Sequence, residues 1–372
     1  MTIRKRKNSY QLDYMDVTGK RVRISYKTKK EAELAEAEAR CNKAKGISNV
    51  IDKSLTVAQA CEEFIERYVK QYCKEKTKDE YIRIINKDFL PYWSNAKIAN
   101  LTKLDIEKFL LYLKDERNLK NASINKYHNI MISIINKQIE YGKIFINVAK
   151  FKKYSVEENQ GRALKQDEIE KLLNVCKKVK PKFYNMLFTA LDTGLRKGEL
   201  LALMWKNVDL NNKKIFVEYS EYKKKLTSPK TKNSIRYVEI SEDLKHILLQ
   251  QKLISGGSDF VFPNKVGGMI DRNNLNRLFN PVRKDSNIGE FRFHDLRHTF
   301  GSQLIEQGYS ALYVQRQMGH SSIKVTFDIY GHLLNEAREK SIISANIEEK
   351  QESVTENQLS HFVTFPVKGE CL

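Results

Sequence analysis

Apolar residues recur every third or fourth position through most of the chain, a spacing that predicts amphipathic helices. Between residues 56 and about 148, four such stripes follow one another with short polar breaks between them. Thr102 stands where it can cap the third helix. This region is expected to form a bundle of four or five helices. Its inward positions are Ala58, Ala60, Phe64, Tyr68 and Val69; Tyr81, Ile84 and Ile85; Ile106, Phe109, Leu110 and Leu113; and Ile124, Tyr127, Ile130, Ile134 and Ile135.

A period of two replaces the helical spacing in two places, and each predicts a small sheet. Residues 9–28 alternate around a turn at Thr18 and Gly19, and an alanine-rich helix is expected over residues 29–45. Residues 213–241 hold two runs of β-branched and aromatic residues with a lysine-rich segment between them, which predicts a hairpin. The fold class expected is therefore mainly α with small β-sheets, an α+β protein.

Two polar, poorly periodic stretches, at residues 46–55 and 151–162, interrupt the predicted elements and are interpreted as linkers. They indicate three domains and a C-terminal tail, with the expected bounds 1–46, 56–150, 163–345 and 346–372. A length of 372 residues suits two or three domains with real cores.

The charge balance points to a polyanionic partner. Lysine and arginine number 66 against 46 aspartate and glutamate residues, a formal net charge of +20. An excess spread over the whole length favours nucleic acid over a merely soluble basic protein. The sequence has neither an apolar run of about 18 residues nor an apolar signal core, and its five cysteines show no paired spacing, so a reducing cytoplasm is expected. No nucleotide-binding fingerprint is present, and no cofactor is expected.

Residues 291–330 gather the side chains best suited to phosphate chemistry. His294 and Arg297 are three positions apart and share a helix face. Leu296, Phe300 and Leu304 form the apolar stripe of that helix, Gly308 ends it, and a second helix over residues 311–318 is bounded by Ser310 and Gly319. His320 follows at the exit of the second helix, Tyr330 comes ten residues later, and Arg196 lies far upstream.

Four motifs in this order resemble the tyrosine recombinases, the integrase family of temperate phages and integrative elements. They are GLRKGEL with Arg196, HDLRH with His294 and Arg297, MGHSS with His320, and IYGH with Tyr330, and the resemblance covers residues 160–345. It implies an arm-type DNA-binding domain, a helical core-binding domain and a catalytic domain, in chain order. It also implies site-specific recombination of double-stranded DNA at attachment sites by a homotetramer, through a Holliday junction, in a bacterial cytoplasm and nucleoid.

The chemistry explains why such residues are needed. A tyrosine hydroxyl that attacks a phosphodiester adds charge to the non-bridging oxygens, and two guanidinium groups, those of Arg196 and Arg297, stabilise it without a metal ion. The resemblance implies a lysine of the hairpin as general acid, with Lys230 favoured and Lys232 left open. It assigns proton donation or acceptance and a phosphate contact to His294, and a hydrogen bond to a non-bridging oxygen to His320. Glu199 is interpreted as an orienting partner.

Other residues are assigned on weaker grounds. Basic residues of the first two domains are expected to contact phosphates, although any one of them alone is more often just a solvated charge: Arg4, Lys5, Arg6, Arg21, Arg23, Lys78, Arg83 and Lys126. His298 and His332 are interpreted as structural, and Tyr309 and Tyr313 as poorer nucleophiles than Tyr330. The apolar patch of the tail, Phe362, Phe365 and Val367, either docks onto another protomer, as in relatives, or belongs to a disordered end.

Three alternatives stay open beside an integrase of a mobile element. One is a chromosome or plasmid dimer resolvase with the same chemistry, although the basic N-terminal module leans away from it. Another is a type IB topoisomerase, which shares the logic of the site. The third, of a different class, is a non-catalytic DNA-binding regulator on a recombinase scaffold. A host DNA-bending or excision factor is a possible further partner of the integrase.

Overall fold

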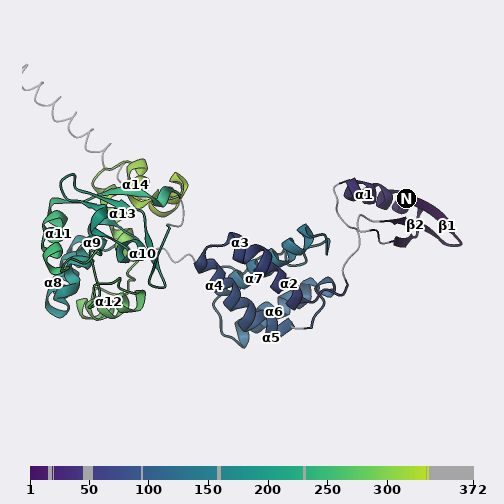
Figure 1. Ribbon diagram of the computed structural model, residues 1–372, viewed down its shortest axis with the longest axis horizontal. Coiled ribbons are helices and arrows are strands. Elements are labelled where there is room, and N and C mark those ends of the chain that lie inside the picture. Colours follow the sequence, from purple (N-terminus) through teal and green to yellow (C-terminus); the bar gives the residue numbers. More distant parts are fainter. Residues whose placement is uncertain are drawn as a thin grey trace, which may run out of the picture. The chain divides into compact units, whose positions relative to one another are not determined.

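The computed structural model (Figure 1) describes residues 1–15, 19, 21–44, 53–93, 95–156, 161–228, 232–331 and 333–334. The chain divides into two compact units, Met1–Glu158 and Asn159–Leu372. Several predicted features lie outside the described residues: Thr18 of the first turn, Lys230, His332, and the tail with Phe362, Phe365 and Val367.

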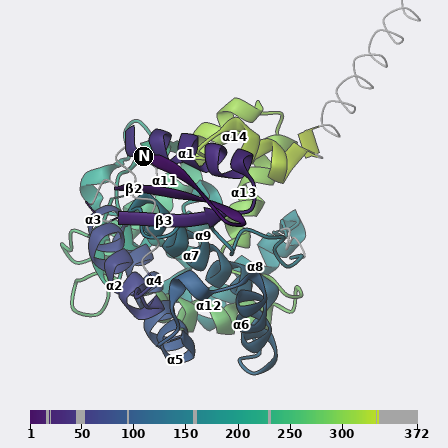
Figure 2. The ribbon, with the colours of Figure 1, turned by 90° about the vertical axis from the view of Figure 1, so that its right-hand side faces the viewer.

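The N-terminal residues form an antiparallel sheet of three strands with one helix on it, the small module that the alternation predicted. The strands follow the order β1-β2-β3, and the helix contacts the second and third of them, as Figure 2 shows in purple. The elements are β1 (Thr2–Arg6), β2 (Ser9–Met15), β3 (Arg21–Tyr26) and α1 (Lys29–Ala44). Leu12, Tyr14 and Val22 pack with Ala39 of α1, so one face of the sheet is covered.

The register places most of the predicted DNA-binding arginines on the other face. Arg4 pairs with Gln11 and Arg23 with Asp13, out of phase with the buried Leu12. Lys5 pairs with Tyr10 and so points to the helix-covered side, a distinction that composition alone did not make.

Residues 57–140 form the predicted helical bundle. Its segments are α2 (Val57–Phe64), η1 (Ile65–Val69) and α3 (Lys70–Tyr72); α4 (Glu75–Ile84), η2 (Ile85–Phe89) and α5 (Leu90–Trp93); η3 (Ile98–Asn100); α6 (Lys103–Asp115); and α7 (Asn121–Glu140). The Thr102 cap is confirmed, since its side chain accepts from the Asp105 backbone N–H in a capping box. All the inward positions expected on α6 and α7 are buried. Two π-helical segments were not predicted: η1 lies between α2 and α3, and η2 lies between α4 and α5.

The second unit combines helices with two small sheets. Its helical elements are α8 (Gln166–Val179), η4 (Pro181–Phe183), α9 (Tyr184–Thr193), α10 (Lys197–Leu201), η5 (Trp205–Asn207), η6 (Lys232–Ser234), α11 (Glu242–Ile254), α12 (Arg272–Ser286), α13 (Asp295–Glu306) and α14 (Ala311–Met318). Residues 323–331 are also helical. The expected limits of α14 hold, with Ser310 as N-cap and Gly319 in the left-handed conformation just past the end.

The strand pairing in the second unit is richer than the single hairpin expected. The two predicted runs do pair, as β5 (Lys214–Val217) and β8 (Arg236–Glu239), and β4 (Val208–Asp209) extends this sheet. Between β5 and β8, however, β6 (Ser220–Tyr222) and β7 (Lys225–Thr227) form a hairpin of their own. The Glu221 carboxylate of that hairpin is buried and accepts from Arg272 of α12, which ties the hairpin to the helices.

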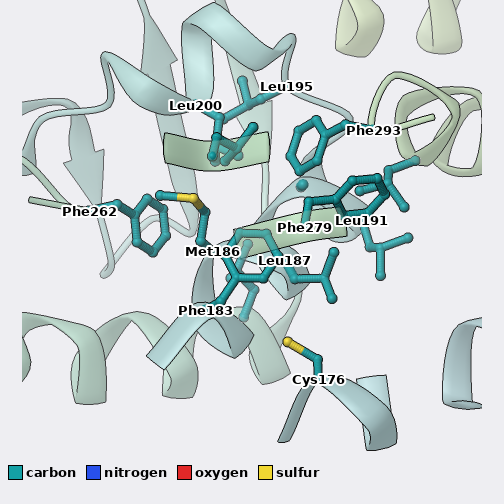
Figure 3. Close-up of a cluster of buried hydrophobic side chains, with 14 of the residues drawn as sticks. Cys176, Phe183, Met186, Leu187, Leu191, Leu195, Leu200, Phe262, Phe279 and Phe293 are labelled. Carbon is teal, nitrogen blue, oxygen red and sulfur yellow. The ribbon is translucent and has the colours of Figure 1, made fainter. Parts of the chain in front are cut away.

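The core of the second unit is aliphatic and aromatic and positions the elements that carry the site. Phe183, Met186 and Leu187 meet Phe279 of α12 and Phe293, which precedes α13 (Figure 3). Burial of such side chains contributes about 1.5–3 kcal/mol each, so this cluster holds α9, α12 and α13 against one another. No helix among the described residues is long and apolar enough to cross a membrane.

Candidate active site

The C-terminal end of α14 is the point at which the site is assembled. Three consecutive backbone carbonyls there accept hydrogen bonds from three arginines that come from different parts of the unit. Arg236 Nε donates to the Gln317 oxygen at 2.7 Å, Arg297 Nη2 donates to the Met318 oxygen, and Arg196 Nη2 donates to the Gly319 oxygen at 2.9 Å. The last carbonyls of a helix lack intrahelical partners and carry partial negative charge, so they suit cations.

Arg297 lies in the interior of the unit. Its side chain is 4% exposed, and Nη1 donates to the Gly194 oxygen at 2.7 Å in addition to the Met318 contact. Burial and the nearby arginine charges lower its pKa. Because both ends of the guanidinium are bonded to carbonyls, its plane is held in one orientation while further N–H groups stay available.

Glu199 joins two of the arginines. It accepts from Arg196 Nη1 at 2.8 Å and from Arg236 Nη2 at 3.1 Å, and it also accepts from the Arg196 backbone N–H at the start of α10. Burial disfavours ionisation of this carboxyl, yet the charges of Arg236 and Arg196 outweigh it and lower the pKa. The arrangement matches the orienting role expected of Glu199, and that role stays a prediction.

Arg236 is a member of the cluster that sequence reasoning missed. Its side chain is buried, on the same face of β8 as Val238. The sequence did hold a signal for it. Side chains alternate between the two faces of a strand, so Arg236 shares the inward face with Val238 and Ile240, whereas Tyr237 points outward. A cation on an inward strand position indicates a buried partner, here Glu199.

His320 follows the three carbonyls directly and is 6% exposed. Its Nδ1 lies 2.9 Å from the hydroxyl of the fully buried Thr326, a second residue that sequence reasoning missed. Burial, with the charges of Arg297 and Arg196, lowers the pKa of His320 to about 3. The ring is therefore neutral at neutral pH, and the Thr326 bond to Nδ1 leaves Nε2 as the nitrogen that can meet a ligand.

His294 stands at the N-cap of α13, and its ring reaches solvent. It meets His298 edge to face, with ring centroids 5.2 Å apart. Loss of hydration, together with His298 and Arg297, lowers the pKa of His294 to about 4. This histidine is thus a neutral group at the mouth of the site.

Tyr330 lies inside the unit, with 2% of its surface exposed. Its ring is nearly parallel to that of His320, with centroids 6.5 Å apart, and its hydroxyl lies 3.5 Å from His298 Nδ1. Burial raises its pKa above the ordinary value, although the Arg297 charge opposes the shift. Tyr309 and Tyr313 stack on each other, and the Tyr313 hydroxyl donates to the Glu239 carboxylate.

The two candidate lysines belong to the segment before β8. Lys230 lies outside the described residues, and Lys232 begins η6, with its backbone described and its side chain not. The next residue, Asn233, donates to the Ser321 backbone oxygen at 3.0 Å. The end of the lysine-bearing segment is therefore attached beside His320.

The predicted DNA-binding residues of the first unit are mostly surface cations with local partners. Arg21 and Arg23 both bind the carboxylate of Asp13, which lowers the Asp13 pKa to about 2, chiefly through the hydrogen bond from Arg21. Lys78 pairs with Glu75 and Lys126 with Glu80. Arg4, Lys5, Arg6 and Arg83 are exposed. Within the described residues, no group of three histidine, cysteine, aspartate or glutamate side chains is arranged to hold a metal ion.

Comparison with known families agrees with this geometry. The model described as "Phage integrase family" matches residues 162–337, which include the whole arginine and histidine cluster and Tyr330. A second model, "Phage integrase, N-terminal SAM-like domain", matches residues 60–140 of the helical bundle. The chain belongs to the phage integrase family. The resemblance that the four motifs carried is confirmed, and with it the expected activity of a tyrosine recombinase, site-specific DNA recombination.

Relatives extend the similarity over nearly the full length of this integrase. The ICEBs1 integrase of Bacillus subtilis (strain 168) is 29% identical over 367 residues, covering 90% of this chain and 96% of the relative. A "Tyrosine recombinase XerC-like" protein of Caldanaerobacter subterraneus subsp. tengcongensis is 26% identical and covers 89% and 93%.

Solved structures share the fold. The Tn1549 transposon integrase in complex with a circular intermediate DNA has a TM-score of 0.69 at 21% identity, covering 78% of this chain and 100% of that one. A lambda integrase tetramer bound to a Holliday junction has a TM-score of 0.60 at 20% identity, covering 86% and 95%. The expected fold class, mainly α with small sheets, is confirmed.

Proposed function

We propose that Tyr330 of this integrase attacks a DNA phosphodiester, so that strands are cut and rejoined through a 3′-phosphotyrosyl bond. The observation that carries the proposal is the convergence of Arg196 and Arg297, distant in sequence, on the adjacent carbonyls of Met318 and Gly319 at the end of α14, in the same cluster as the buried Tyr330. Two fixed guanidinium groups beside a phenol form a site for a phosphate under attack.

The neighbouring groups have distinct tasks in this proposal. Arg196 and Arg297 bind the non-bridging oxygens through N–H groups that the carbonyls leave available. His320 donates from Nε2 to one of those oxygens, in the tautomer that the Thr326 hydroxyl supports. Glu199 orients Arg196 and offsets part of the positive charge of the cluster.

The leaving 5′ oxygen takes a proton from a lysine, Lys230 or Lys232, with Lys230 favoured. The bond from Asn233 to Ser321 supports a lysine position near His320, since the chain can span only about 3.5 Å per residue. His294, neutral and solvent-facing, exchanges protons with water.

Atoms and energy balance without a nucleotide. The Tyr330 hydroxyl gives its proton to a histidine of the site as its oxygen bonds to phosphorus. The bond to the 5′ oxygen breaks, that oxygen takes the lysine proton, and the 3′-phosphotyrosyl ester conserves the energy of the phosphodiester. Attack by the 5′ hydroxyl of another strand reverses the step and completes the exchange.

The proposed setting is a mobile genetic element in a bacterial cell, with the integrase acting at the nucleoid. Similarity over nearly full length to the ICEBs1 integrase supports an element-borne role in integration and excision, and a dimer resolvase of the same chemistry stays the alternative. We propose a homotetramer on two DNA duplexes, by analogy with the lambda integrase tetramer bound to a Holliday junction. We also propose that a host DNA-bending or excision factor takes part. The basic residues of the first unit proposed to contact DNA are Arg4, Lys5, Arg6, Arg21, Arg23, Lys78, Arg83 and Lys126.

A suicide substrate tests the proposal directly. The purified chain is incubated with EDTA and a nicked duplex that carries the junction sequence of its element, and the products are separated on a denaturing gel. We expect a slowly migrating covalent protein–DNA band that is lost in Tyr330→Phe and strongly reduced in Arg196→Ala, while both variants still bind the duplex. Binding of this duplex without any adduct would leave a DNA-binding regulator as the better description.

The same assay separates the two lysines. A duplex with sulfur in place of the bridging 5′ oxygen has a leaving group that needs no general acid, because a thiolate leaves far more readily than an alkoxide. We expect Lys230→Ala to be slow on the oxygen substrate and fast on the sulfur substrate, with Lys232→Ala close to the wild type on both. The opposite pattern would assign the role to Lys232.

A further inference from the structure

We propose that His298 accepts the phenolic proton of Tyr330 as the strand is cut, which makes it a further catalytic residue of this integrase. The proposal rests on the proposed role of Tyr330 as the nucleophile. It departs from the sequence-based interpretation of His298 as a structural residue, and it separates the proton acceptor of the tyrosine from the solvent-facing His294.

The tyrosine hydroxyl is seated against α13 at His298. Tyr330 Oη lies 3.5 Å from His298 Nδ1, and one helical turn farther along α13 stands Gly301. A Cβ at Gly301 would overlap the Tyr330 hydroxyl and the ring carbon that bears it. The phenol end therefore lies directly on the helix backbone, a position that only glycine leaves open, and it points to His298.

A second glycine holds the imidazole from another direction. A Cβ at Gly161 would overlap Cδ2 and Nε2 of the His298 ring. The backbone of residue 161 thus packs against the ring edge away from Nδ1, while Nδ1 meets the tyrosine. The Gly161 backbone and the Tyr330 hydroxyl contact opposite edges of the imidazole and hold it in one orientation, as expected of a positioned proton acceptor.

Other groups near the phenol are poorly suited to accept its proton. The Nδ1 of His320 is already paired with Thr326, and its ring lies roughly parallel to that of Tyr330 rather than in line with the hydroxyl. Arg297 carries donors only. His294 contacts the His298 ring, on the solvent side of α13.

The two groups start in the protonation states that the transfer needs, although both shifts widen the difference in pKa between the phenol and the imidazole. Burial lowers the pKa of His298, with Arg297 and Arg292 acting in the same direction and Asp295 opposing them, so the imidazole is neutral and able to accept near pH 7. Burial raises the pKa of Tyr330, so the phenol does not ionise by itself at that pH. Contact with a base lets the proton leave as the bond to phosphorus forms, so that a free phenolate is not required.

The Tyr330 oxygen forms its bond to phosphorus, the phenolic proton moves to His298 Nδ1, the bond from phosphorus to the 5′ oxygen breaks, and that oxygen takes the proton of the proposed lysine acid. In religation the proton on His298 returns to the departing phenol.

The test measures single-turnover adduct formation on the nicked duplex with two substitutions combined. General-base assistance contributes about 10²–10⁴-fold, so His298→Ala is expected to slow adduct formation by about 100-fold or more, with duplex binding unchanged. His246→Ala, at an exposed histidine of α11, is the matched control and is expected to keep the wild-type rate.

The deciding measurement places 3,5-difluorotyrosine, a phenol of lower pKa, at position 330. A more acidic phenol depends less on a base, so it should recover about tenfold of the rate in His298→Ala and give little gain in the unsubstituted protein. A wild-type rate in His298→Ala, or a loss that difluorotyrosine does not recover, would overturn the role of His298 as base. Absence of adduct in the unsubstituted protein would instead overturn the proposed function.

Discussion

Arginines occupy two contrasting environments in this integrase. In the second unit, Arg236 and Arg297 are buried beside Arg196, and each binds one of three consecutive carbonyls at the end of α14. In the N-terminal sheet, Arg21 and Arg23 share the carboxylate of Asp13; both arginine side chains are 54% exposed, whereas the Asp13 side chain is 9% exposed. Arginine side chains therefore have one fixed orientation in the interior of the second unit, whereas those of the N-terminal sheet reach solvent and can change their orientation.

The difference has an energetic basis. Buried charges need their partners, since removing one member of a buried pair costs about 3–5 kcal/mol, whereas exposed pairs are worth about 0–1 kcal/mol. A cluster held at such cost is suited to a transition state, because its donors do not reorganise during the reaction. The guanidinium groups of Arg21 and Arg23 reach solvent, so they can turn from Asp13 to a phosphate, which suits adaptable contact with a DNA backbone.

The largest effect is expected for Glu199→Gln. Removing this carboxylate leaves Arg196 and Arg236 without their shared anion, so the free energy of unfolding at pH 7 should fall by about 3 kcal/mol. Urea unfolding measures the change. The control is Glu290→Gln, which breaks an exposed pair with Arg283 and should cost less than about 1 kcal/mol.

The pH dependence of the same variant gives a second reading. The folded-state pKa of Glu199 is lowered, so its contribution is complete above the unfolded pKa of about 4.3 and is lost as pH falls through the folded value. The difference in the free energy of unfolding between wild type and Glu199→Gln should therefore be constant above about pH 5.5 and become smaller at lower pH. If wild type and Glu199→Gln had equal free energies of unfolding at pH 7, the buried arginines would not depend on their shared carboxylate, and the two environments would not differ in this respect.

A smaller effect is expected for Thr326→Val, which keeps the volume and removes the hydroxyl that contacts His320 Nδ1. An unpaired buried donor or acceptor costs about 1–3 kcal/mol, which corresponds to a loss of about 5- to 150-fold in the rate of adduct formation. Thr326→Ser keeps the hydroxyl and should retain most of the rate. Equal rates in both variants would show that the tautomer of His320 is held in another way.

On the exposed side, Asp13→Asn is expected to strengthen DNA binding. The substitution frees Arg21 and Arg23 for phosphates, so the slope of log affinity against log salt should steepen by about 1–2. Binding of the full chain to a random duplex at several salt concentrations measures it. Glu33→Gln makes the same change of charge on α1 and serves as the control. An equal gain in DNA affinity in both variants would mean that only the net charge of the protein matters.

The smallest effect is expected for Lys126→Gln on α7. Losing one phosphate contact should lower the salt slope by about 1, and the free energy of unfolding should change by less than about 1 kcal/mol, because the pair with Glu80 is exposed. Lys103→Gln is the matched control, since Lys103 is also 61% exposed and paired with a glutamate. An unchanged slope in Lys126→Gln alone would remove this residue from the predicted DNA contacts.

Much of the fold could be predicted because local signals and tertiary packing agree. The inward positions of α6 and α7, the Thr102 cap and the limits of α14 follow from helical spacing and capping chemistry. The inner hairpin β6–β7 was missed, since runs of three residues are too short for a periodic pattern. Its position depends on Glu221 and Arg272, which are far apart in the chain.

The sequence by itself determined the family, the order of the motifs and the residue types able to bind and cut a phosphodiester, because those signals are carried by fixed local spacings. Only the tertiary structure decided that three arginines converge on α14, that Arg236 belongs to the cluster, and that Tyr330 lies against His298 and Gly301. These contacts join segments that no local spacing relates, and burial there decides which charges and protons the side chains hold.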